Sequence, residues 1–126
     1  MEWRSVFAIV PVPVFYTDSL PAGVGGEQRG PVVRILPRFE HDEGIHHHEL
    51  AHVEIFWITL GLASFASLFS TSFRIWNEAR AYKRQTQYPD GNDNYLSLDD
   101  AAARLAGPRY GFHITQDEAK RLIEEG

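Results

Sequence analysis

Residues 44–57, with the sequence GIHHHELAHVEIFW, contain four of the six histidines of the chain. Within this stretch His48, Glu49 and His52 form the pattern HExxH. Residues four apart lie on one face of a helix, so the imidazoles of His48 and His52 can bind one metal ion. The Glu49 carboxylate stands beside that face, where it can take a proton from a metal-bound water. The spacing therefore predicts a Zn²⁺ site together with its general base.

A zinc site that activates water uses three protein ligands, so one more ligand is needed. Ile55 and Ile58 stand where an HExxHxxGxxH motif requires Gly and His, which excludes that extended motif. The inverted order HxxEH is also absent. A separate helix must then supply the third ligand, and the segment NEARAY (77–82) offers Glu78.

Other residues near the motif are less suitable as the third ligand: His41, His46, His47 and Glu54. Glu54 follows His52 by two residues and lies about 200° away around the helix, so we expect it to be solvated or salt-bridged. His46 and His47 precede the motif and are expected to face solvent or to lie behind the ligands. His41 lies further upstream, where nothing in the sequence holds it near the metal.

These residues give the sequence a resemblance to zincin metallopeptidases of the gluzincin type, and more narrowly to the small single-domain zincin-like proteins of phages and bacteria. The resemblance rests on HELAHVEIFW (48–57) and RIWNEARAYKRQ (74–85), with a weaker likeness in LAGPRYGFHITQDEAKRL (105–122). The chain departs from the family pattern because 25 residues separate His52 from Glu78, more than in the familiar gluzincins. The small zincin-like proteins that it resembles also lack the large second domain that builds a substrate cleft in bigger peptidases.

The resemblance implies a zinc-dependent metallopeptidase that hydrolyses the peptide bonds of a peptide or protein substrate. His48, His52 and Glu78 would bind Zn²⁺, and Glu49 would be the general base that activates water. Cleavage specificity is left open. Two alternatives also remain open: a catalytically inactive zinc-binding domain with a regulatory or structural role, and a small protein inserted in a membrane.

Three side chains outside the motif are candidates for stabilising a transition state: Tyr82, Tyr110 and His113. Tyr82 lies one turn after Glu78 and can equally be a core residue. Tyr110 and His113 lie in a segment that can fold over the site and stabilise an oxyanion. The strand VVRIL (32–36) is expected to hold a substrate peptide along its edge.

The strands that accompany the motif are predicted by apolar runs and by breaker residues. Residues 3–16 predict an edge strand that is interrupted by Pro11 and Pro13. Residues 21–31, which are rich in glycine, predict a loop or the tip of a hairpin. Residues 32–36 predict a short strand that ends at a proline.

Four helices should follow these strands. The first carries HExxH and begins at about Ile45, and the second covers residues 73–87 after the N-cap cluster STS. Ser97 and Thr115 are typical N-caps of two short C-terminal helices. The sequence thus predicts an α+β fold over residues 1–126 as a single domain. Under the resemblance this is a minimal zincin-like fold, with short N-terminal strands or a hairpin before the four helices.

Composition bounds the possible partners and location. With 126 residues, of which 44% are hydrophobic, the chain can build one core. A net charge of −5, with Lys and Arg scattered, argues against a nucleic-acid partner. The absence of cysteine excludes disulfides and thiolate zinc sites. The N-terminus lacks the features of a signal peptide, so a cytoplasmic location is expected, and the oligomeric state is left open.

Residues 55–73 form a run of nineteen uncharged residues, close to the length of a membrane span. We expect a buried helix and a turn instead. A straight helix through this run would place His52 and Glu78 about 39 Å apart, which prevents them from binding one ion. The chain should therefore turn back between Gly61 and Ser72, and no membrane contact is expected.

Overall fold

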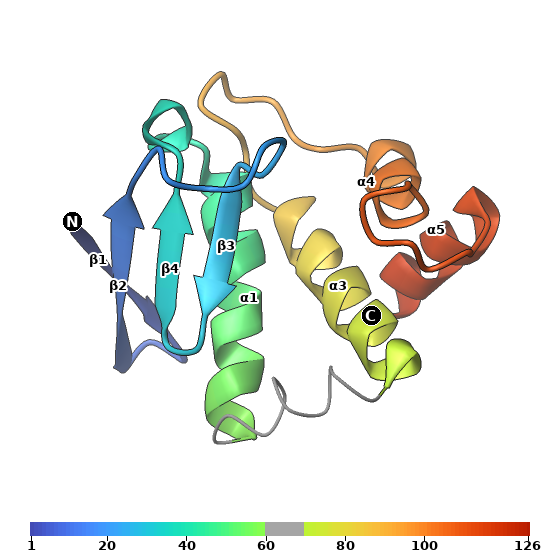
Figure 1. Cartoon of the computed structure of the whole chain (residues 1–126), viewed down its shortest axis with the longest axis horizontal. Coiled ribbons are helices and arrows are strands. Elements are labelled where there is room, and N and C mark those ends of the chain that lie inside the picture. The colour runs from blue at the N-terminus through green and yellow to red at the C-terminus, as the bar shows by residue number, and fades with distance from the viewer. Residues whose placement is uncertain (60–69) are drawn as a thin grey trace.

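The computed structural model describes residues 1–59 and 70–126, and within them a four-stranded sheet packs against one helix, beyond which three more helices lie (Figure 1). The strand order in the sheet is β1-β2-β4-β3. The α+β class predicted from the sequence is therefore confirmed. The strands occupy the N-terminal third of the chain and the helices the rest, as expected.

The first two strands, β1 (Glu2–Val6) and β2 (Val10–Tyr16), form an antiparallel hairpin where a single strand was predicted. The turn between them places Phe7 and Ala8 in the left-handed region, with φ of 54° and 62°. Such turns normally contain Gly or Asn, so the sequence contained no signal for this one. β1 is the edge strand here. The two prolines of β2 lie before Val14, where its pairing with β4 begins, so their missing N–H groups cost no bond to that neighbour.

The other two strands, β3 (Gly26–Arg29) and β4 (Val32–Ile35), form a second antiparallel hairpin around Gly30, whose φ is 56°. The segment 21–31 was predicted to be a loop throughout, and β3 corrects that prediction. Its sequence GEQR has a low strand propensity, and it becomes a strand because it pairs with β4. β4 also pairs with β2, so it lies inside the sheet and β3 forms the edge.

The helices agree closely with the predicted N-caps: α1 (Glu43–Ile58), α3 (Thr71–Gln85), α4 (Leu98–Leu105) and α5 (Gln116–Glu125). The side chains of Asp42, Ser70, Ser97 and Thr115 each accept a hydrogen bond from a backbone N–H of the first helical turn. A single 3₁₀ turn, η1 (Pro37–Phe39), leads from β4 toward α1.

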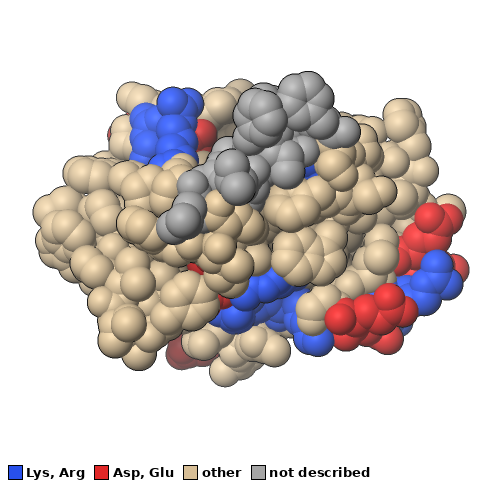
Figure 2. Space-filling model, turned by 90° about the horizontal axis from the view of Figure 1, so that it is seen from below, with Lys and Arg blue, Asp and Glu red and all other residues tan. Residues whose placement is uncertain are grey.

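The two ends of the uncharged run lie in different helices, since α1 ends at Ile58 and α3 begins at Thr71. The turn expected between Gly61 and Ser72 falls largely on residues 60–69, outside the described residues. No helix in the described part of the chain is long and apolar enough to cross a bilayer. Figure 2 looks at this end of the molecule, where uncharged residues make up most of the visible face and charged residues gather in a few places.

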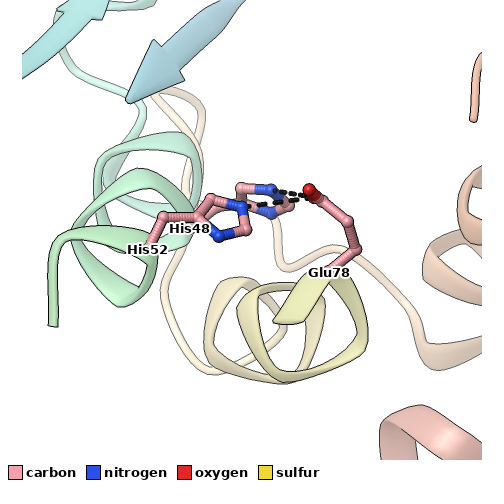
Figure 3. A group of neighbouring side chains, drawn as sticks. All are labelled: His48, His52 and Glu78. Carbon is pink, nitrogen blue, oxygen red and sulfur yellow. Dashed lines mark hydrogen bonds and ion pairs between the residues drawn. The ribbon is translucent and has the colours of Figure 1, made fainter. Parts of the chain in front are cut away.

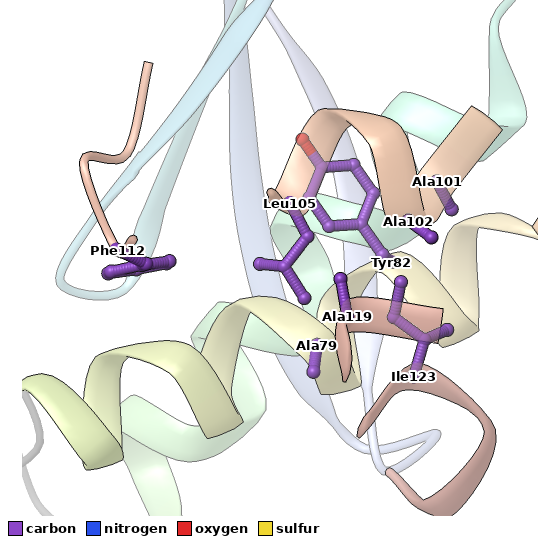
Figure 4. Packing of buried hydrophobic residues seen from close by; sticks show 8 residues of the cluster. All are labelled: Ala79, Tyr82, Ala101, Ala102, Leu105, Phe112, Ala119 and Ile123. Atoms are coloured by element: carbon purple, nitrogen blue, oxygen red, sulfur yellow. The ribbon is translucent and has the colours of Figure 1, made fainter. Parts of the chain in front are cut away.

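Buried hydrophobic residues form two separate clusters. The sheet cluster comes from the strands and α1: Val6, Val12, Val14, Val33, Ile35, Leu50 and Val53. The helical cluster comes from α3, α4, α5 and the segment between the last two (Figure 4): Ala79, Tyr82, Ala101, Ala102, Leu105, Phe112, Ala119 and Ile123. α1 and α3 meet between these clusters, and the polar side chains of the candidate site lie at that interface.

Candidate metal centre

The three predicted metal ligands converge at the interface of α1 and α3. His48 and His52 project from successive turns of α1, and Glu78 reaches toward them from α3 (Figure 3). Glu78 Oε1 lies 3.4 Å from His48 Nε2 and 3.2 Å from His52 Nε2. One ligand atom from each residue can be chosen so that all three lie within 4.8 Å of one another. Two imidazoles, which bind metal ions in their neutral form, and one carboxylate at this spacing are a donor set that can bind one divalent ion.

α1 and α3 run side by side in opposite directions (Figure 1). A glycine and two hydrogen bonds allow and hold their close approach. A Cβ added at Gly44 would lie 3.2 Å from Gln85 Cγ and 3.2 Å from the Tyr88 carbonyl oxygen, so glycine permits this approach. The Gly44 N–H donates to the Pro89 carbonyl at 3.0 Å. Further along the interface, the Arg80 guanidinium donates to a backbone carbonyl of α1 at 3.0 Å. Glu78 is therefore held opposite the HExxH face.

A side chain that the sequence did not identify orients one of the histidines. The Nδ1–H of His52 donates to Asn77 Oδ1 at 3.0 Å, which leaves Nε2 facing Glu78. Such second partners fix the tautomer and the ring orientation of metal-binding histidines. The Nδ1 atom of His48 is buried and has no hydrogen-bond partner among the described residues. The only sign of this role in the sequence is that Asn77 directly precedes Glu78, and no spacing rule identifies such a partner.

Without a metal ion, the pKa values of His52 and Glu78 are shifted in opposite directions. Burial alone would lower the pKa of His52, but Glu78, with smaller contributions from Glu49 and Asn77, outweighs burial and raises it to about 9. Burial would likewise raise the pKa of Glu78, but His52 and His48 hold it well below its ordinary value. The pair is thus an ion pair, and a divalent cation would replace the proton of His52.

Glu49 lies next to the three ligands and is not itself bonded to them. Its side chain is largely buried, with 8% of the residue exposed, and burial raises the pKa of its carboxyl group. The strand β3 passes close to it, since a Cβ added at Gly26 would lie 3.3 Å from Glu49 Cγ. The carboxylate has no hydrogen-bond partner in the described part of the chain, so it is free to accept a proton.

Two of the three candidates for stabilising a transition state lie at the site. The Tyr110 hydroxyl donates to Glu78 Oε1 at 3.3 Å, and the hydroxyl of Tyr82 lies 2.8 Å from that of Tyr110. The Tyr82 ring also packs edge-on against His48, with 4.5 Å between ring centroids. Burial raises the pKa of both tyrosines, so both stay protonated hydrogen-bond donors. His113 is exposed and does not line the cleft around the ligands.

The ligands face an open cleft with two adjoining parts of about 440 and 280 Å³. Both parts are lined by Gly26, His48, Glu49, Arg109 and Tyr110. The smaller part is also lined by Glu27 and Gln28, which follow Gly26 on β3. The exposed strand beside the site is therefore β3. The prediction that VVRIL would present an edge to a peptide is wrong, because β4 is paired on both sides.

The remaining acids and histidines near the motif have other partners. His46 was expected to face solvent or to lie behind the ligands. It is fully buried and hydrogen bonded instead, with Nδ1 donating to the Asp42 carbonyl at 2.7 Å and Nε2 3.0 Å from the Tyr16 hydroxyl. His47 stacks on Tyr88, with 3.5 Å between ring centroids.

Glu54 forms the salt bridges that were one of its two expected roles. It is 8% exposed and pairs with Arg80 at 2.8 Å and with Arg84 at 3.0 Å, both on α3. His41 is exposed and belongs to no group of potential metal ligands in the described residues. Among the acids and histidines near the motif, only Glu78 approaches both His48 and His52.

The comparisons with known proteins assign no family to this arrangement: no protein-family model matches the chain, and neither a curated protein nor a solved structure matches it.

Proposed function

We propose that the chain is a zinc-dependent metallopeptidase with a zincin-like domain, in which His48, His52 and Glu78 bind Zn²⁺ and Glu49 is the general base. The observation that carries this proposal is the convergence of two imidazole nitrogens and one carboxylate oxygen beside a buried, unbonded carboxylate in an open cleft. The donor set fits zinc in a catalytic site, where three protein ligands leave a fourth position for water. The edge strand β3 supports a peptide as the substrate, because its unpaired backbone groups line the same cleft.

Each residue of the site has a distinct role in this reaction. When bound, the ion would supply a water with a pKa of about 7 and would polarise the scissile carbonyl. Glu49 takes a proton from that water and passes it to the leaving amine. Asn77 holds His52 in the tautomer that presents Nε2. The Tyr110 hydroxyl stands at the cleft wall, and its one proton, which it donates to Glu78 in the absence of an ion, can be donated to an oxyanion instead when Glu78 binds the ion.

The decisive experiment measures zinc and hydrolysis in the same preparations. One zinc per chain, measured by mass spectrometry of the metal content, and chelator-sensitive cleavage of casein or a fluorogenic peptide are expected. Glu49→Gln should keep the zinc and lose hydrolysis by about 10²–10⁴-fold, because the base is not a ligand. Glu78→Ala should lose both. A wild-type protein without bound zinc, or a Glu49→Gln variant with unchanged turnover, would refute the assignment.

A second candidate, a zinc-binding domain without peptidase activity, is favoured by one observation. The ligands come from the two helices that join the sheet cluster to the helical cluster, which is where a purely structural ion would be placed. Stoichiometric zinc combined with no hydrolysis of any peptide, by protein whose melting temperature falls on chelation, would decide for this second candidate.

A further inference from the structure

A further pocket of about 380 Å³ adjoins the cleft at the N-terminal end of α1. Four residues line both this pocket and the 440 Å³ part of the cleft: Phe39, Ile45, Gln85 and Arg104. A peptide in the cleft can therefore extend from the ligands into this pocket. None of the groups discussed above for metal binding or proton transfer lines it.

The charged groups of this pocket are mostly acidic and come from three separate elements. Asp42 caps α1, Asp90 lies in the turn after α3, and Asp100 lies in the first turn of α4. The only cation among the residues that line the pocket is Arg104, so three carboxylates and one guanidinium leave a formal charge of −2. Burial, together with the nearby Asp90, raises the pKa of Asp42, and a cation in the pocket would relieve this unfavourable environment.

Gln85 provides the independent indication of a ligand. Only 7% of this residue is exposed, and within the described residues its side-chain amide makes no hydrogen bond. The stem of the side chain is fixed against Gly44, so the amide is held at the junction of the cleft and the pocket. Neither atom of the amide is among the fully buried atoms that lack a partner, so the amide reaches the space of the cleft and the pocket, where its oxygen can accept a hydrogen bond from a bound cation.

The size of the pocket indicates which kind of cation it takes. The described residues contain one group close enough to hold a metal ion, formed by His48, His52 and Glu78, and the three aspartates do not form another. The volume is instead in the range of organic ligands. The exposed ring of Tyr95 also lines the pocket and can lie against an ammonium or guanidinium group.

We propose that this pocket binds a cationic group of the substrate, either a lysine or arginine side chain or a free N-terminal ammonium group. Gln85 follows Glu78 by seven residues on α3, a distance of about 10 Å along the helix. An extended peptide covers that distance in about three residues. The cation should therefore lie two or three residues from the scissile bond. That the peptide is a substrate, and this spacing from the bond, rest on the proposed peptidase function; the binding of a cationic group of a peptide does not.

The test uses zinc-loaded full-length Glu49→Gln protein and fluorescent peptides of Ala and Ser, acetylated and amidated, in which one Lys or norleucine is moved along the sequence. Fluorescence anisotropy should give about tenfold tighter binding with Lys than with norleucine at one or two positions. A second set without Lys compares free and acetylated N-termini and identifies which cation the pocket takes.

Substitutions then locate the effect. Asp90→Asn keeps the oxygen that accepts the N–H groups of Asn92 and Asn94, so it removes charge and preserves the turn. Combined with Asp100→Asn, it should reduce the preference for the cation to about onefold. Asp93→Asn is the matched control for Asp90→Asn alone, because each removes one negative charge from the same turn and only Asp90 lines the pocket. This control should keep the preference.

The outcomes separate this proposal from the peptidase proposal. A preference for a cation that the double variant abolishes supports the pocket, even when the wild-type protein hydrolyses nothing. Peptides that bind without any preference, a preference that survives in the double variant, or no binding of any peptide at millimolar concentration would each overturn it. Hydrolysis without a cation preference overturns the pocket alone.

Discussion

The sheet cluster and the helical cluster are packed by different means. Valine, isoleucine and leucine fill the sheet cluster, where β-branched side chains of three strands interlock with one face of α1. Alanine supplies half of the buried residues in the helical cluster, which allows α3, α4 and α5 to approach closely. The α1–α3 interface between them contains charged and polar side chains: His48, His52, Glu54, Glu78, Arg80, Arg84 and Gln85.

Each cluster buries its own hydrophobic side chains, whereas polar contacts set the position of one cluster relative to the other. Hydrophobic burial is non-directional, but salt bridges and metal ligands require particular atoms at particular distances. The site that brings Glu78 opposite His48 and His52 therefore lies at the α1–α3 interface, where such directional contacts fix how the two helices are positioned. The following experiments test that division of roles.

The largest effect is expected from removing zinc. A ligand present at a thousand times its Kd stabilises the folded state by about 4 kcal/mol, so chelation should lower the melting temperature of zinc-loaded protein. Amide hydrogen exchange should increase more in α3 and α4 than in β2 and β4, because the proposed zinc ion would attach the helical cluster to α1. An unchanged melting temperature after chelation, or equal loss of protection in both regions, would contradict this division.

Glu54→Gln should be the next most destabilising change. It leaves the Arg80 and Arg84 guanidinium groups without their carboxylate in an interface where Glu54 is 8% exposed. Breaking such a pair costs about 3 kcal/mol, measured by urea unfolding. Asp99→Asn is the control, because the Asp99 side chain is 71% exposed and pairs only with the exposed Lys120 among the described residues, and it should cost less than about 1 kcal/mol. Equal losses from the two substitutions would show that the polar interface is not special.

Asn77→Ala should weaken zinc binding without removing a ligand. Loss of the partner that holds His52 Nδ1 is expected to reduce the zinc affinity by about 10–100-fold in a competition with a chromophoric chelator. The stability of the zinc-free protein should change much less. Asn92→Ala, in an exposed turn, is the control and should leave the affinity unaltered. An Asn77→Ala variant with wild-type affinity would mean that His52 is oriented by packing alone.

The smallest effect concerns the sheet cluster and pH. Arg4 on β1 donates two hydrogen bonds to Glu43 at the start of α1 and lowers the pKa of Glu43 from its ordinary value of 4.5. The resulting stability is present above pH 4.5 and is lost as the pH falls through the lowered pKa. Because Glu43 is partly exposed, Arg4→Gln should cost less than about 1 kcal/mol at pH 7, and this cost should shrink as the pH falls below the lowered pKa of Glu43. A cost that does not change with pH would indicate that Arg4 acts through packing.

Helix positions were predictable because their signals are local. Ser70, Ser97 and Thr115 each accept a hydrogen bond from the backbone N–H three residues ahead, so a short sequence window contains both partners. The strands were harder. β3 becomes a strand only through its partner β4, and the Phe7-Ala8 turn contains neither Gly nor Asn. Sheet order decides which strand is exposed, and that order is absent from any local window.

The sequence by itself determined that His48 and His52 share a helix face with Glu49 beside it, because the helical period acts over four residues. It also favoured Glu78 over the nearer acids and histidines. Only the tertiary structure decided that Glu78 meets those histidines, that Asn77 orients one of them, and that β3 lines the cleft. The reason is the separation along the sequence of the residues that interact. A helix turn is specified by adjacent residues, whereas the crossing of α1 and α3 depends on contacts between residues far apart in the chain.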